Sequence, residues 1–161
     1  FWLIGLAPLT FRQLLWQKYW LCVATTSAFS IGIVTLSCLI LRMSPVPFFL
    51  SVYSIAAVNF GLAGMSVGLG SLYPNFNEDN PARIVSGMGG TLNFLLSIAY
   101  IAAIVAGQTF MLQWERVIGS AAPASYWTAF AAVVAFTALL TAAATFIPMR
   151  LGLQNLEQLE F

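Results

Sequence analysis

Four long stretches without a charged residue constrain this chain more than any other feature. They cover residues 19–41, 48–72, 88–112 and 126–147. A membrane-spanning helix needs about 20 predominantly apolar residues, and each stretch meets that length. Because a bilayer offers no hydrogen bonds to the backbone, helices are the simplest way for such segments to cross it. The stretches therefore predict an all-α membrane protein with four transmembrane helices in a single domain, residues 1–161.

The composition agrees with a bilayer as the solvent for much of the chain. Of the 161 residues, 60% are hydrophobic and 7% are charged, whereas soluble domains carry about 25% charged residues. The net charge is +1, so there is no basic patch to neutralise nucleic-acid phosphates. The chain contains no histidine, which removes the most common general base and metal ligand. We therefore expect a lipid bilayer as partner, no nucleic acid and no cofactor.

Motifs of known enzyme classes are missing from the sequence. There is no G-x-x-x-x-G-K-[ST] loop to hold nucleotide phosphates, no H-E-x-x-H and no G-x-S-x-G. Glu78 and Asp79 are adjacent, but a solvated loop explains them better than catalysis. No ionisable residue lies deep in a span, which argues against a proton- or ion-coupled pump. We expect that the chain is not itself an enzyme.

The two ends of the chain predict amphipathic structure at the membrane surface. Thr10 and Gln13 match a helix capping box, and the residues that follow alternate between polar and apolar. Residues 1–18 are therefore expected to form a short interfacial helix before the first span. Alternatively, they are the solvent-exposed end of that span. Pro148 is expected to stop the fourth span, and residues 148–161 to form an amphipathic cytoplasmic tail.

A polar elbow, residues 72–90, separates the second and third spans. Pro74 should end one helix because its ring cannot continue the hydrogen-bond ladder. Asn80 followed by Pro81 is typical of a helix cap and first position, and acidic groups are favoured at that positive helix end. We interpret the elbow as a structural hinge rather than a catalytic site. Its residues are Pro74, Glu78, Asp79, Asn80, Pro81 and Arg83.

Basic residues in the loops predict the orientation, since cytoplasmic loops are enriched in Lys and Arg. One side of the membrane would hold Arg12, Lys18, Arg83 and Arg150, and the other Arg42 and Arg116. We therefore expect both ends and the elbow to lie in the cytoplasm.

Small and polar residues in the second span are candidates for contacts between helices. Gly64 and Gly68 form a GxxxG pair, and Ala57 with Gly61 a looser one. Small residues let helix backbones approach closely in lipid, either at a dimer or sliding interface or in packing within one subunit. Asn59 lies at mid-span, where an amide either bonds to a neighbouring helix or lines a path.

The stretch GLGSLYPNFNEDNPARIVSGMGGTLNFLLS, residues 68–97, resembles the permease subunits of ATP-binding cassette (ABC) exporters of the second type, in particular one bacterial branch. Members of that branch carry a glycine-rich span, a Pro-x-Phe turn, an acidic pair, an Asn-Pro and a Gly-Gly-x-Leu. The matching residues here are Gly68 and Gly70, Pro74 and Phe76, Glu78 and Asp79, Asn80 and Pro81, and Gly89 to Leu92. The start of the chain is also similar to the family's cytoplasmic connector.

The resemblance implies a permease subunit that forms a substrate pathway in the bacterial inner membrane. It implies a dimer of such subunits docked on separate ABC ATPase subunits, which would hydrolyse the ATP. Since family members have six spans and this chain begins at Phe1, we expect it to be the last part of a longer protein. Residues expected to contact the ATPase are Pro8, Arg12, Gln17 and Lys18. The alternative is a channel-like or structural membrane subunit without an ATPase.

Overall fold

The computed structural model describes residues 10–73, 87–118 and 123–158, and all regular structure in these ranges is α-helical. The helices are α2 (Phe11–Ile40), α3 (Pro45–Leu72), α5 (Met88–Ile118) and α6 (Pro123–Gln158). Each contains a segment long and apolar enough to cross a membrane. These segments are Arg12–Ile40, Pro45–Leu72, Met88–Phe110 and Trp127–Asn155. The prediction of an all-helical protein with four span-length helices is confirmed.

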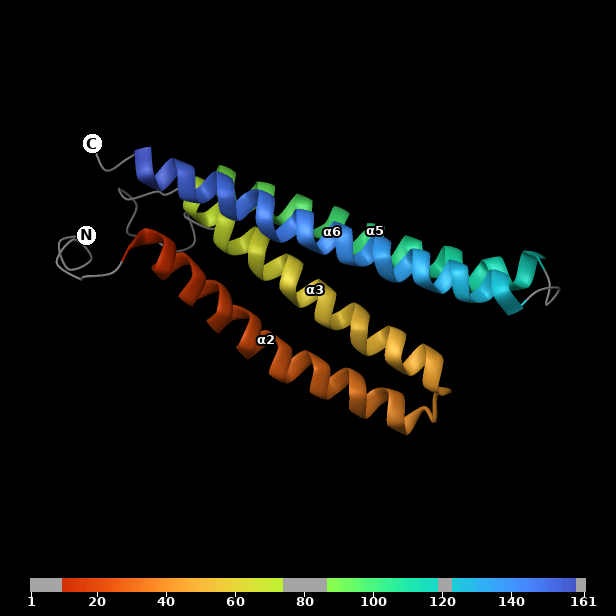
Figure 1. The fold of residues 1–161 in the computed structure, drawn as a ribbon. Helices are drawn as coiled ribbons and strands as arrows, with labels where there is room; N and C mark the ends of the chain where they lie inside the picture. Colours follow the sequence, from red (N-terminus) through yellow and green to blue (C-terminus); the bar gives the residue numbers. More distant parts are fainter. Residues whose placement is uncertain (1–9, 74–86, 119–122, 159–161) are drawn as a thin grey trace.

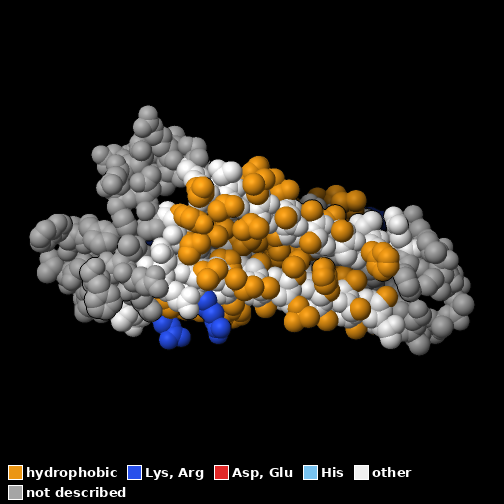
Figure 2. All heavy atoms as spheres, turned by 90° about the horizontal axis from the view of Figure 1, so that it is seen from above, with side chains coloured by type: hydrophobic (Ala, Val, Ile, Leu, Met, Phe, Trp, Pro, Cys, Tyr) orange, Lys and Arg blue, Asp and Glu red, His pale blue; other side chains and the backbone are white. Residues whose placement is uncertain are grey.

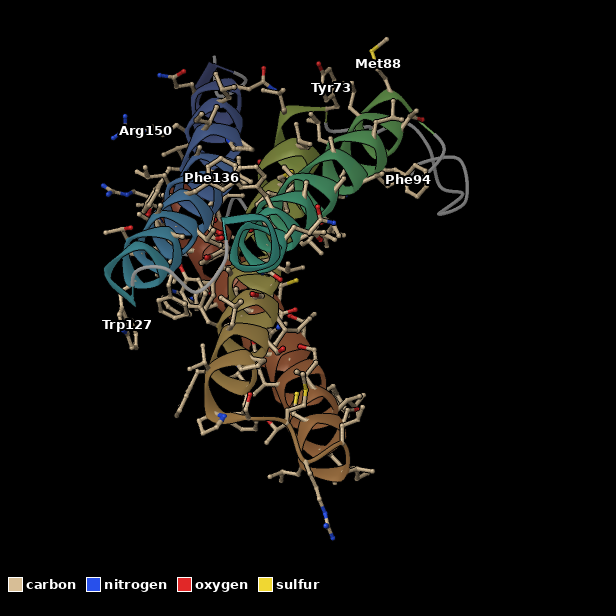
Figure 3. The ribbon with its side chains drawn as sticks, turned by 90° about the vertical axis from the view of Figure 1, so that its right-hand side faces the viewer. Tyr73, Met88, Phe94, Trp127, Phe136 and Arg150 are labelled. Carbon is tan, nitrogen blue, oxygen red and sulfur yellow. The ribbon has the colours of Figure 1, made fainter. Side chains whose placement is uncertain are left out.

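Successive helices run in opposite directions, so the start of α2 and the end of α6 lie at the same end of the bundle (Figure 1). We call this the basic end, because Arg12, Lys18 and Arg150 belong to it. α3 and α6 form the most extensively packed pair, and α2 and α5 each pack against both. Within the described ranges α2 and α5 make no contact with each other. Away from the basic end, α2 and α3 diverge from α5 and α6 (Figures 1 and 3).

α2 begins at the predicted capping box. The Thr10 hydroxyl accepts a hydrogen bond from the Gln13 backbone N–H (3.4 Å), and the Gln13 side chain accepts one from the Thr10 N–H (3.2 Å). These bonds satisfy backbone donors that the start of a helix leaves unpaired. The helix then runs as one element from Phe11 to Ile40, with no break between the polar first turns and the apolar segment that begins at Tyr19. Residues 11–18 are thus the first turns of the membrane helix, and a separate interfacial helix is not observed there.

Two of the predicted helix ends are wrong. α6 continues through Pro148 to Gln158, so residues 148–158 extend the fourth span instead of forming a separate tail. Proline removes a backbone donor and often ends a helix, but membrane helices tolerate it where other groups satisfy the backbone acceptor that it frees. α5 also continues past residue 112 to Ile118, which places Glu115 and Arg116 on the helix and not in a loop.

The described part of the face seen in Figure 2 is largely apolar. Phe29 of α2 is 75% exposed and Leu139 of α6 is 72% exposed, and further large hydrophobic side chains lie outward on all four helices. An apolar surface of this extent would be unfavourable in water, whereas lipid chains can cover it. The arrangement is that of a multi-pass membrane protein.

Candidate functional site

Glycines of α3 allow the other helices to approach its backbone closely. A Cβ atom at Gly64 would lie 2.5 Å from the Cα of Thr145, and one at Gly68 would lie 2.4 Å from the carbonyl carbon of Pro148, both in α6. At Gly61 it would lie 2.4 Å from the ring of Tyr100 in α5. Real Cβ atoms do not approach other atoms this closely, so a larger residue at Gly64 or Gly68 would push against the α6 backbone, and one at Gly61 would require the Tyr100 ring to move. The contacts join helices of the same chain.

Asn59 joins α3 to α2. Its side-chain amide donates hydrogen bonds to the hydroxyl oxygens of Ser30 (2.6 Å) and Ser27 (3.3 Å), and the residue is buried. In a bilayer such a bond between helices stabilises by about 0.6 kcal/mol on average. The structure therefore places Asn59 in a contact between helices.

A row of polar side chains on α5 faces α3, and the sequence interpretation gave it no role. Tyr100 donates its hydroxyl proton to the Ala57 carbonyl (2.8 Å) and lies 2.8 Å from the Thr141 hydroxyl. On the same face, Gln108 donates to the Ser54 hydroxyl and Asn93 donates to the Ser66 hydroxyl (3.2 Å). The helical spacing of positions 93, 100 and 108 is a signal that could have identified this face.

The basic end combines exposed polar side chains from the start of α2 and the end of α6. Arg12, Gln17 and Lys18 of α2 are exposed, and so is Arg150 of α6. Figure 3 shows Arg150 pointing away from the bundle. The charged side chains that the structure describes at this end are all basic, and they lie beside the apolar surface.

The described residues contain no candidate metal centre. In residues 10–73, 87–118 and 123–158, no cluster of three His, Cys, Asp or Glu side chains could hold a metal ion. Several predicted site residues lie outside these ranges, so their predicted roles stay predictions. They are Pro8 of the connector and the elbow residues Pro74, Glu78, Asp79, Asn80, Pro81 and Arg83.

Fold and contacts together define a helical, multi-pass membrane protein. Along its whole length, residues 1–161, the chain matches the model of the family described as "Putative ATP-binding cassette", and it belongs to that family. Comparison with curated proteins and with solved structures gave no match.

This family assignment corrects the predicted identity. The family is described by the ATP-binding cassette and not by a permease, so the identification as the permease subunit of an exporter is wrong. The alternative subunit without an ATPase is not favoured by this match either. The relation to ABC systems stands. The identification rested on the resemblance of residues 68–97, which indicates a relation to ABC systems but does not define the role within such a system.

Proposed function

We propose that this chain is the membrane-embedded component of an ABC system and that it docks an ATP-binding domain or subunit at its basic end. The observation that carries the proposal is the combination of four span-length apolar helices with membership of the ATP-binding cassette family. In this role the bundle holds the ATP-binding component at the membrane and changes its helix packing when that component changes shape.

ATP binding and hydrolysis are assigned to the docked component. A P-loop holds nucleotide phosphates with backbone N–H groups of a glycine-rich loop and with the lysine of G-x-x-x-x-G-K-[ST]. The 161 residues contain no such motif. The membrane component is accordingly proposed to be without ATPase activity of its own.

The proposed docking surface includes Gln17 and Lys18, which are exposed on the early turns of α2. The next residue, Tyr19, is buried in a cluster with Val23 of the same helix, Ala63 of α3 and Met149 of α6. A force applied to α2 at Gln17 and Lys18 would thus reach α3 and α6 through the packed side chains of this cluster. Shifts of packed helices are a common way in which one component transmits a change to another.

We further propose that the basic end lies in the cytoplasm and that the membrane is the bacterial inner membrane. The positive-inside rule supports this orientation, since Arg12, Lys18 and Arg150 belong to the basic end while Arg42 lies at the other. A second copy of the chain is the other proposed partner. The number of copies of this chain in the purified complex, measured by native mass spectrometry, would test whether a second copy is present.

Site-specific photocrosslinking in the native membrane tests the docking proposal. A photoreactive amino acid at position 17 should capture a polypeptide that mass spectrometry identifies by its P-loop peptide. The same probe at Phe29, which is exposed in the middle of α2, should capture lipid only. If position 17 also captures lipid only, while ATP photoprobes label the chain itself, the docking proposal is wrong.

A further inference from the structure

A groove lies at the basic end between the first turns of α2 and the last turns of α6. It has a volume of about 250 Å³. Its lining includes Leu15 and Trp16 of α2 with Phe146 and Met149 of α6, and its two charged side chains are Arg12 and Arg150. The groove thus has an apolar lining with positive charge from both helices.

The groove lies where the headgroup region of a bilayer is expected. The residues from Tyr19 to Ile40 in α2 are uncharged, and at about 1.5 Å per residue they span the roughly 30 Å hydrocarbon core. Trp16 and Tyr19 pack edge to face with ring centroids 5.6 Å apart, and both residue types gather at membrane interfaces. In Figure 2, basic side chains lie where the apolar surface approaches one end of the bundle.

We propose that this groove binds an anionic phospholipid, with its phosphate between Arg12 and Arg150 and one acyl chain along Trp16 and Phe146. The guanidinium group suits this ligand because its paired N–H donors match two phosphate oxygens. Arg12 and Arg150 line the groove from two different helices, so a phosphate in the groove can be approached by a guanidinium group from each side. Basic pockets between membrane helices are known to hold anionic headgroups.

The lining also indicates an occupant with a long apolar chain. Phe146 lines the groove and is 53% exposed, and its neighbour Ile147 is 58% exposed on the outside of α6. The apolar lining therefore continues into the outer apolar surface, where an acyl chain can follow it. Of the helix pairs that touch, α2 and α6 have the least extensive contact. A lipid in the groove would bridge these two helices.

Fluorescence quenching tests this proposal directly. The full protein, with Trp16 kept and its other tryptophans replaced by phenylalanine, is reconstituted in phosphatidylcholine vesicles. A small fraction of brominated phosphatidylglycerol or of brominated phosphatidylcholine is then added. Each arginine near a membrane surface contributes about fivefold in affinity for anionic lipid. For two arginines these factors multiply, so we expect the brominated phosphatidylglycerol to quench Trp16 at a mole fraction roughly twenty-five-fold lower than the brominated phosphatidylcholine.

Matched variants decide the outcome. Arg12→Gln combined with Arg150→Gln should abolish the preference, and Arg42→Gln at the opposite end should leave it intact. Native mass spectrometry of the protein with all its tryptophans should show retained phosphatidylglycerol that the double variant loses. Equal quenching by both lipids, or a preference that the double variant keeps, would overturn the proposal. So would loss of the preference on adding millimolar inorganic phosphate, which would indicate a site for a free anion. A photocrosslinker at position 150 that captures polypeptide in place of lipid would also contradict it.

Discussion

Replacing Gly68 with alanine probes the contact between α3 and α6 on which the bundle depends. The new methyl group would lie 2.4 Å from the carbonyl carbon of Pro148 and 2.7 Å from the backbone nitrogen of Met149. Backbone atoms cannot rotate away as a side chain does, so the two helices must move apart. Overpacking of this kind costs about 1–3 kcal/mol.

Gly70 on the same helix provides a matched control. Among the described residues, no atom outside its own helix neighbourhood lies within 4 Å of the Cβ position there. Alanine favours the helix by up to about 1 kcal/mol at either position, so this contribution largely cancels in the comparison. We therefore expect Gly68→Ala to be less stable than Gly70→Ala by about 1–3 kcal/mol.

The difference can be measured by reversible unfolding in mixed micelles of a nonionic detergent and dodecyl sulfate, followed by circular dichroism. Both variants and the wild-type protein would be titrated under the same conditions. Equal free energies of unfolding for the two variants would refute the close contact between Gly68 and Pro148.

Three further outcomes are expected. Asn59→Ala should lower the free energy of unfolding by about 0.6–1.7 kcal/mol because its bonds to α2 are lost; a double-mutant cycle with Ser30→Ala that shows no coupling would contradict this. Tyr100→Phe should cost about 1 kcal/mol in the same assay, since the hydrogen bond from its hydroxyl to the Ala57 carbonyl of α3 is lost, and an unchanged unfolding curve would argue against that bond. In a protein without native cysteines, Ser44→Cys should react with an impermeant thiol reagent added outside intact cells, and Gln17→Cys should not; the reverse pattern would invert the proposed orientation.

The positions of the four spans could be predicted because hydrocarbon thickness imposes a length that uncharged runs reveal directly. The start of α2 was equally accessible, since the capping box at Thr10 and Gln13 is a local pattern. Helix ends were harder to predict. Pro148 normally disfavours a helix, yet α6 continues through it, with Gly68 of α3 close to its backbone, a contact that the sequence does not display.

Contacts between helices depend on which faces meet, and one sequence does not show this. Glycine spacing identified α3 as a close-packing helix, but it did not reveal that Gly61 meets Tyr100 or that Gly64 meets Thr145. Arg12 and Arg150 lie far apart in the chain, so their shared groove became visible only in the folded bundle. The elbow motif indicated a relation to ABC systems. It did not define the role within such a system.

Photoaffinity labelling with an azido analogue of ATP tests the central claim most directly. The protein would be purified in mild detergent from its native membrane together with whatever remains bound, and labelled peptides would be mapped by mass spectrometry. The account predicts that the label falls on a docked ATP-binding domain or subunit, at a P-loop, and that unlabelled ATP competes for it. Saturable labelling within residues 1–161, with no other ATP-binding sequence in the complex, would contradict it.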